Sequence, residues 1–347
     1  MTPDHVARLD VARSGHHHDR APVSDRITST HGATSTANEV LADHDLTGTR
    51  YLVTGGYAGI GMETARALAS AGAAVVVAGR DLRRAGEVAT ELRGLGPGHS
   101  EPLELDLGHG GSVDAAAAHL GHTALTGVIC NAGVMACPLR RTDEGWEWHM
   151  AVNVLGHVRL LWRLLPALGR AEGRRRVVLL SSTAHHLSPW SRDDPHWYDR
   201  DYDKWRAYGQ SKTADSLVAV ALQGSGLVAG LDAFAVHPGG ILTDLQRHLP
   251  RREMMALGWV DSEGEPARDG FKTPEQGAAT QVWAATDPAL AGRGGIYLQD
   301  CAQAAPAPDD GRRTGVKDWA VDPIAAATLW QWCERELQLD PTAPPTS

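Results

Sequence analysis

The 347-residue sequence predicts an α/β fold in which a seven-stranded parallel sheet is doubly wound by helices within a single domain. Short continuous runs of valine, leucine and isoleucine alternate with helical stretches, which is typical of parallel strands buried on both faces. A hydrophobic fraction of 42% is ordinary for a globular chain long enough to bury a large core. Sheets of this kind bind ligands beyond the carboxyl ends of their strands.

Each expected strand is a short apolar run bounded by glycine or polar residues. Strands are predicted at residues 50–55, 73–79, 102–107, 125–133, 175–182, 231–240 and 294–300. Helices are predicted at residues 34–46 (short and capped), 59–71, 82–93, from 112 onward, 143–169 and from about 206 onward. Because helices separate the strands, the sheet is expected to be parallel and covered on both faces.

The two ends of the chain differ in composition from its middle. Residues 1–44 are polar with little periodicity, which predicts a flexible N-terminal extension. Residues 45–340 are predicted to form the domain, with its loops 184–206 and 242–272 contacting the substrate. Residues 341–347, "PTAPPTS", are predicted to be a disordered tail.

Charge and cysteine usage exclude several classes of protein. A net charge of −9 with no basic stripe argues against nucleic-acid binding. No run of eighteen apolar residues occurs, so no membrane span is expected, and the polar N-terminus predicts no secretory signal. The four cysteines lack a disulfide pattern, which favours reduced thiols in a cytoplasmic protein. The histidine runs 16–18 and 185–186 have no spaced partner ligands, so no metal site is predicted.

The loop after the first strand reads "TGGYAGIG", residues 54–61, and places Gly55, Gly59 and Gly61 in Gly-x-x-x-Gly-x-Gly spacing. The first glycine permits a tight turn, the second lets the backbone approach a pyrophosphate, and the third lets helix and strand pack closely. The following helix offers phosphate its free N–H groups and a favourable dipole. The loop therefore predicts a dinucleotide cofactor; the alternative is a glycine-rich turn without a ligand.

The end of the second strand indicates which dinucleotide is bound. An acidic residue there would accept from the ribose 2′-hydroxyl of NAD, but this chain has Gly79 followed by Arg80. A guanidinium matches a 2′-phosphate, so NADP(H) is favoured and NAD(H) stays an alternative. Arg80 could instead pair with Asp81 or face water. Asp106, which ends the third strand, could meet the adenine or cap the following turn.

The stretch "RAYGQSKTADSLVAV", residues 206–220, places Tyr208 and Lys212 on one face at the start of a helix. A tyrosine with its ordinary pKa near ~10 needs a lower pKa to exchange protons efficiently at neutral pH. The positive charge of Lys212 favours the phenolate and is therefore expected to lower the pKa of Tyr208. This pair predicts a general acid–base; the alternative is a surface pair on an amphipathic helix.

Five motifs occur in a fixed order over roughly residues 45–335. They are "TGGYAGIG" (54–61), "NAGV" (131–134), "SS" (181–182), "YGQSK" (208–212) and "HPGG" (237–240). Together they resemble the short-chain dehydrogenase/reductase family, which implies a Rossmann fold. "NAGVMACP", "NVLGH" and "AYGQSK" further resemble its retinol-dehydrogenase-like branch, which acts on apolar carbonyls and alcohols. One departure is Asp215, which stands where that branch often has asparagine.

The resemblance implies the site residues. Ser181 and Ser182 point to opposite faces, so only one can hold the substrate oxygen, and the resemblance selects Ser182. Lys212 would also hold the nicotinamide ribose, and Asn153 a water in a relay to Lys212; Asn153 could instead be a polar residue that bends its helix. The implied catalytic residues are thus Asn153, Ser182, Tyr208 and Lys212. The implied cofactor residues are Thr54, Gly55, Tyr57, Gly59, Ile60, Gly61, Arg80, Asp106, Leu107, Asn131, Ala132, Gly133, Tyr208, Lys212, Pro238, Gly239, Ile241 and Thr243.

Substrate contacts are expected from the two long loops and the loop after the fourth strand. The segment 242–259 is expected to act as a lid. The candidate substrate residues are His185, Trp190, Met135, Leu245 and Trp259; packing within the loops is the alternative for each of them.

The sequence therefore predicts an NADPH-dependent carbonyl reductase, or alcohol dehydrogenase in reverse. It would act on a small-to-medium, partly apolar ketone or aldehyde, with secondary metabolism as one setting. A homodimer or homotetramer is the expected assembly. Two alternatives stay open: a redox-neutral enzyme on the same scaffold, such as a cyclase, dehydratase or epimerase, and an NADP(H)-sensing protein without catalysis.

Overall fold

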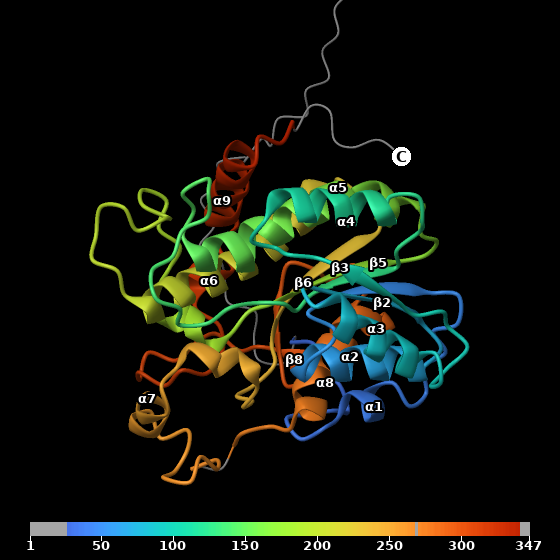
Figure 1. Ribbon diagram of the computed structural model, residues 1–347, viewed down its shortest axis with the longest axis horizontal. Coiled ribbons are helices and arrows are strands. Elements are labelled where there is room, and N and C mark those ends of the chain that lie inside the picture. Colours follow the sequence, from blue (N-terminus) through green and yellow to red (C-terminus); the bar gives the residue numbers. More distant parts are fainter. Residues whose placement is uncertain (1–25, 268–269, 341–347) are drawn as a thin grey trace, which may run out of the picture.

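The computed structural model describes residues 26–267 and 270–340 of the chain. Its centre is an eight-stranded sheet of order β3-β2-β1-β4-β5-β6-β7-β8, in which every pairing except β7 with β8 is parallel (Figure 1). The strands are β1 (Arg50–Thr54), β2 (Ala74–Gly79), β3 (Glu101–Glu104), β4 (Gly127–Cys130), β5 (Arg175–Leu180), β6 (Leu231–His237), β7 (Tyr297–Gln299) and β8 (Ala302–Gln303).

Helices cover both faces of the sheet, as the continuous apolar strands require. One face carries α4 (Gly110–Leu120), α5 (Gly156–Arg170), α6 (Lys204–Ser225) and α9 (Pro323–Glu336), which share one apolar core with the strands. The other face carries α1 (Ala37–Val40), α2 (Gly59–Ser70), α3 (Leu82–Leu92) and α8 (Pro274–Thr286), which share a second core. Shorter helices are η2 (Met150–Leu155), η3 (Thr183–Leu187), η4 (Asp244–His248), α7 (Arg251–Ala256), η5 (Pro288–Leu290) and η6 (Asp318–Ala320).

The predicted Rossmann-like arrangement is confirmed and the seven predicted parallel strands are present, but the sheet has an eighth, antiparallel strand that was not predicted. Asp300 and Cys301 adopt left-handed backbone conformations, with φ of 52° and 53°, and turn the chain back after β7. Ala302 and Gln303 then pair antiparallel with β7 as the eighth strand. No glycine marks this turn in the sequence, so no turn was expected there.

Several predicted boundaries are also wrong. The strands expected at 125–133 and 231–240 end earlier, at Cys130 and His237. The helix expected from residue 143 starts only at about residue 148. Before it, Arg141 and Glu147 pair across a turn in which Gly145 has a φ of 89°.

The prediction of a flexible extension over 1–44 is wrong for residues 26–44. Thr36 caps α1 through a capping box with Glu39, as the predicted short helix requires. Ala37, Val40 and Leu41 are buried in the core beside α8. Residues 1–25, with the 16–18 histidine run, and the tail 341–347 lie outside the described residues. Across the described part of the chain, no helix has the length and apolar character needed to span a membrane.

Candidate active site

A cleft lies at the carboxyl ends of the parallel strands, where the strand order reverses between β1 and β4. The segments that follow β1 to β6 all contribute to its walls, and its volume is about 480 Å³. Most predicted site residues line it: Thr54, Gly55, Tyr57, Gly59, Ile60, Arg80, Asp106, Leu107, Asn131, Ala132, Gly133, Met135, Ser182, Tyr208, Lys212, Pro238, Gly239, Ile241, Thr243, Leu245 and Trp259.

The glycine loop forms a tightly packed cradle at the end of β1. A Cβ atom at Gly61 would overlap the Asn131 side-chain amide and the Gly55 carbonyl, so only glycine fits there. Asn131 holds the loop, because its Nδ2 donates to the Thr54 carbonyl at 2.8 Å. The loop leads directly into the N-terminus of α2, a twelve-residue helix whose first N–H groups point to the cleft end of the sheet.

The ring of Tyr57 packs against the end of β2. The Tyr57 ring lies so close to Gly79 that a Cβ at position 79 would overlap ring carbons. Asp81 accepts from the Arg84 amide through Oδ1 and caps α3, and its Oδ2 lies 4.0 Å from the Arg83 guanidinium. The guanidinium of Arg84 lies 5.4 Å from the centre of the Tyr57 ring.

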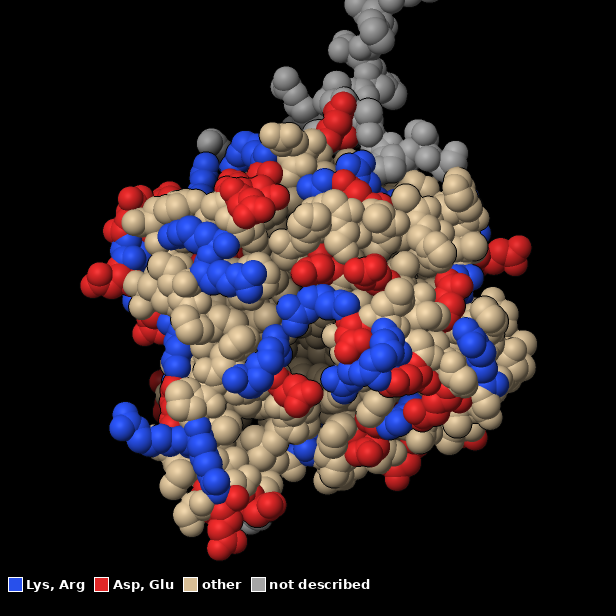
Figure 2. All heavy atoms as spheres, viewed as in Figure 1, with Lys and Arg blue, Asp and Glu red and all other residues tan. Residues whose placement is uncertain are grey.

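Arginines gather at the mouth of the cleft. Arg80, Arg84 and Arg247 are exposed and all three line it, and Figure 2 shows Lys and Arg side chains around a hollow on this face. Arg84 and Arg247 are not among the predicted site residues. The signal for Arg84 was its position four residues after Arg80 at the start of a helix, whereas Arg247 reaches the cleft only through the fold of the 242–259 segment.

Of the two roles considered for Asp106, the structure shows the capping of the turn that follows β3. Its carboxylate accepts from the Gly108 amide at 2.9 Å, while its own amide donates to the Ser112 hydroxyl. Asp106 therefore stabilises the turn after β3, and it lies in the cleft wall together with Leu107.

Tyr208 and Lys212 lie on α6 and both are buried, with side chains that reach the cleft. Asp203 caps this helix by accepting from the amides of Trp205 and Arg206, which sets the first turn of the helix just before Tyr208. The Lys212 Nζ lies 5.8 Å from the centre of the Tyr208 ring. The prediction that the two side chains share one helix face is confirmed.

The Lys212 charge lowers the pKa of Tyr208 as expected, but the net shift is upward. Burial raises the pKa of Tyr208 above its ordinary value, and this outweighs the lowering by the Lys212 charge and by a hydrogen bond with Ser182. The Lys212 charge is in turn shared with Asp215, whose Oδ2 lies 2.8 Å from Nζ. Lys212 Nζ also donates to the Leu180 carbonyl at 2.7 Å.

The two serines after β5 have different surroundings. The buried Ser181 hydroxyl donates to the Lys212 carbonyl at 2.7 Å and accepts from Ser216 at 2.9 Å, so it is fully used within the protein. The Ser182 hydroxyl accepts from the Ala184 amide at 3.1 Å, lines the cleft together with Tyr208, and lowers the pKa of that phenol. This geometry agrees with Ser182 as the serine that contacts a substrate.

Asn153 lies in the π-helical segment η2 and does not line the cleft. Its side chain makes two hydrogen bonds with the backbone of Val134: it accepts from the amide at 2.8 Å and donates to the carbonyl at 3.0 Å. These two bonds form a bracket around Val134. It also donates to Ser211, whose hydroxyl donates to the Tyr208 carbonyl. Asn153 therefore ties the segment after β4 to α6, and its main-chain carbonyl accepts from His157.

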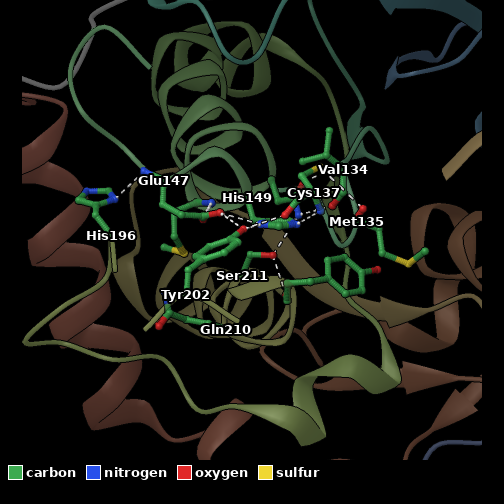
Figure 3. A network of polar contacts seen from close by, with 12 residues as sticks. Val134, Met135, Cys137, Glu147, His149, His196, Tyr202, Gln210 and Ser211 are labelled. Atoms are coloured by element: carbon green, nitrogen blue, oxygen red, sulfur yellow. Dashed lines mark hydrogen bonds and ion pairs between the residues drawn. The ribbon is translucent and has the colours of Figure 1, made fainter. Parts of the chain in front are cut away.

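A buried polar network continues from this bracket (Figure 3). The Glu147 carboxylate lies 2.7 Å from His149 Nδ1 and accepts from the Tyr202 hydroxyl and the Met150 amide. His149 Nε2 accepts from the Cys137 amide, which makes Nδ1 the protonated nitrogen. Although burial opposes ionisation, these hydrogen bonds lower the pKa of Glu147. The network joins the segment after β4 to the 184–206 loop; isolated polar residues in the sequence carried no signal for it.

The wall beside Tyr208 is apolar. A small buried cluster surrounds Tyr208 and consists, besides Tyr208, of Met135, Ala136, Ala184 and Leu249. Five partly buried apolar side chains pack against this cluster: Leu187, Trp205, Leu245, Met254 and Trp259. The Trp205 and Trp259 rings meet edge to face at 5.8 Å between centres. The 242–259 segment thus folds over the cleft as η4 and α7.

Two predicted substrate residues do not reach this wall. His185 is fully buried, where its Nδ1 donates to the Ser182 carbonyl and its Nε2 accepts from the Lys317 amide. Trp190 packs on Trp332 of α9, with 5.9 Å between ring centres. Both predictions are wrong, because segments near the C-terminus cover these side chains. Among the described residues, no group of three or more His, Cys, Asp or Glu is arranged to hold a metal ion.

The fold and the cleft define a dinucleotide-binding oxidoreductase site, and comparison with known proteins gives its family. Residues 49–254 match the family model described as short chain dehydrogenase. A "Probable oxidoreductase" of Streptomyces lividans is 44% identical over 291 residues, covering 83% of this chain and 97% of that protein. Retinol dehydrogenase 12 of Homo sapiens is 35% identical over 293 residues, covering 82% and 85%. The solved structure "Pseudomonas aeruginosa RhlG/NADP active-site complex" is 26% identical with a TM-score of 0.57, covering 74% and 95%.

The chain therefore belongs to the short-chain dehydrogenase/reductase family and is an NAD(P)-dependent oxidoreductase. The predicted family and its retinol-dehydrogenase-like branch are confirmed. The cleft fits the dinucleotide on independent grounds. The glycine cradle leaves no space for a side chain at Gly61, and the buried Asn131 Oδ1 has no hydrogen-bond partner among the described residues.

Proposed function

We propose that this protein is an NADPH-preferring carbonyl reductase that acts on a small-to-medium, partly apolar ketone or aldehyde. The observation that carries the proposal is the placement of Tyr208, Lys212 and Ser182 between an arginine-lined cofactor cleft and an apolar wall. When bound, NADPH supplies a hydride, which carries two electrons to the carbonyl carbon and leaves NADP⁺.

The protein's own residues orient the carbonyl and supply its proton. The Ser182 and Tyr208 side chains both line the cleft, and a carbonyl oxygen bound between them would accept from both hydroxyls. As negative charge develops on that oxygen, Tyr208 gives it the hydroxyl proton and the product is an alcohol. Lys212 stabilises the resulting phenolate by its charge until solvent restores the proton.

The preference for NADPH is inferred from the end of β2. Arg80 and Arg84 line the cleft there, and no acidic side chain of β2 competes for a ribose hydroxyl. The Tyr57 ring fills the space against Gly79 where an acidic side chain would otherwise stand. Two guanidinium groups suit the charge of a 2′-phosphate.

The substrate class is inferred from the wall beside Tyr208. Met135, Leu245 and Trp259 give this wall apolar side chains, and an apolar carbonyl compound would bury surface against them. The human relative is named a retinol dehydrogenase, which agrees with an apolar alcohol or aldehyde as substrate.

A panel of aliphatic, aromatic and isoprenoid ketones and aldehydes, assayed for oxidation of NADPH and of NADH, tests the proposal. We expect turnover of apolar members with NADPH, at a kcat/KM at least tenfold above that with NADH. Product formed without consumption of NADPH would instead show a redox-neutral enzyme. Tight NADP(H) binding with no turnover across the panel would show a sensing protein.

A further inference from the structure

Asp215 stands directly beside the Tyr208–Lys212 pair, although it does not line the cleft. It lies one turn along α6 from Lys212, and both side chains are buried. Its Oδ2 contacts the Lys212 Nζ at 2.8 Å, whereas its Oδ1 has no hydrogen-bond partner among the described residues. A buried carboxylate with one unpartnered oxygen is costly, so its retention calls for a functional reason.

Two charged side chains, Lys212 and Asp215, act on Tyr208. The electrostatic influences on Tyr208 are the positive charge of Lys212 and the negative charge of Asp215, which oppose each other. Lys212 is therefore a partly neutralised cation and not the free charge that the sequence motif suggests. Burial raises the pKa of Asp215 to about 6 while Lys212 lowers it, so the carboxylate is ionised at neutral pH.

Three other titratable groups near the pair are neutral at neutral pH, namely Cys130, His157 and Tyr297. Cys130 on β4 is buried, which raises the pKa of its thiol well above the usual range. Burial lowers the pKa of His157 on α5 to about 4 and raises the pKa of Tyr297 on β7. His149 faces the Tyr208 ring at 6.0 Å between centres, and its Nε2 accepts a hydrogen bond and so carries no proton.

We propose that Asp215 is a positioning residue that holds Lys212 in place, neutralises part of its charge and thereby keeps Tyr208 a phenol over the neutral range. The phenol is the form that gives a proton to a carbonyl oxygen. The Asp215 carboxylate thus favours carbonyl reduction. It raises the pH at which Tyr208 becomes the phenolate, which is the form needed for alcohol oxidation. This inference rests on the proposed reductase function for its kinetic part.

Replacement Asp215→Asn removes the charge and keeps the shape of the side chain. Tyr208 can be titrated in the full-length protein by tyrosinate absorbance, as the difference between each protein and its Tyr208→Phe derivative. We expect the wild-type midpoint to lie above the ordinary value of about 10, and the Asp215→Asn midpoint to lie below that of wild type. The alkaline limb of kcat/KM for NADPH-dependent carbonyl reduction should move in the same direction by a similar amount.

Asp232→Asn is the matched control, because Asp232 is an equally buried carboxylate that pairs with Arg176 at 3.4 Å at the amino end of β6, opposite the end that lines the cleft. It should leave the Tyr208 midpoint unchanged. A midpoint unmoved by Asp215→Asn, or raised by it, would overturn the proposal. If that variant does not fold, a wild-type Tyr208 midpoint below about 10 overturns it equally. The titration needs no substrate, so failure of the reductase function and failure of this inference are separate results.

Discussion

The Tyr57 ring lies against the Cα atom of Gly79, in the space that any side chain at position 79 would need. This contact closes the end of β2 to the carboxylate that would select NAD. The same ring faces Arg84, whose guanidinium lies 5.4 Å from the ring centre. The proposed preference for NADPH therefore depends on a ring and two arginines acting together.

Arg80→Ala and Arg84→Ala test this arrangement. Each removes one cation from the part of the cleft where the 2′-phosphate would lie, and a charge-assisted hydrogen bond contributes about 1.5–3 kcal/mol. We expect the Kd for NADPH to rise roughly tenfold to a hundredfold in each variant, with little change for NADH. Isothermal titration with both cofactors measures this directly.

Arg83→Ala is the control for these two variants. Arg83 lies on the same turn of α3, but it pairs with Glu87 on the helix surface and does not line the cleft. Equal losses of NADPH and NADH affinity in the Arg80 and Arg84 variants would contradict a role in recognising the 2′-phosphate.

Tyr208→Phe removes the proposed acid and keeps the ring in its apolar cluster. Because only the hydroxyl is lost, the fold and the cofactor cleft should be preserved. We expect kcat for carbonyl reduction to fall by about 10²- to 10⁴-fold while the Kd for NADPH changes less than threefold. Steady-state kinetics and fluorescence titration of NADPH provide the two values. A variant that keeps full turnover would remove Tyr208 from the mechanism.

Ser181→Ala and Ser182→Ala form a pair that separates structure from chemistry. Ser181 makes two hydrogen bonds within the core, so its loss should cost about 1–3 kcal/mol of unfolding free energy and leave kcat nearly unchanged. Ser182 faces the cleft, so its loss should lower kcat about 10²-fold or more with little effect on stability. Urea unfolding and steady-state kinetics of both variants check the assignment, and the opposite pattern would reverse the roles of the two serines.

His185 should make the protein sensitive to acid. Burial lowers the pKa of His185 to about 3, below its unfolded value of about 6.5, so the unfolded chain binds more protons between these two pH values. Its contribution is therefore complete above pH ~6.5 and is lost as the pH falls toward 3, by up to about 1.4 kcal/mol per pH unit.

Urea unfolding of wild type and His185→Gln at pH 7.0, 6.0 and 5.0 tests this sign. The variant is expected to be less stable at pH 7.0 and to lose less stability on acidification. His119→Gln, at an exposed position on α4, should keep the wild-type slope. A His185→Gln slope as steep as wild type would contradict the buried neutral imidazole.

The motifs of the sequence located most of the site because their geometry is local. The glycine spacing between 55 and 61 describes one turn and the start of one helix, and Tyr208 and Lys212 are one helical turn apart. Residues directly after a strand, such as Asn131 and Ser182, must lie at the carboxyl edge once the sheet is parallel. Short-range spacing and the alternation of strands and helices were sufficient for these features.

Packing between segments far apart in the sequence determined the features that were predicted wrongly. His185 and Trp190 looked like substrate contacts, but Lys317 and Trp332, more than a hundred residues away, cover them. The chain before residue 45 was predicted to be flexible because its composition is mostly polar. Three apolar side chains on α1 and just after it are nevertheless buried. Such contacts join segments distant in sequence, and no local periodicity records them.

The amino-acid order alone predicts a parallel α/β sheet from its alternating apolar runs and helices, and a dinucleotide loop and an acid–base pair from short-range spacing. The three-dimensional packing decides in which direction the pKa of Tyr208 shifts, because burial of Tyr208 and the ion pair between Asp215 and Lys212 exist only once α6 is enclosed. Spacing brings the phenol and the ammonium together, and the surrounding dielectric and counter-charge determine how readily the proton leaves.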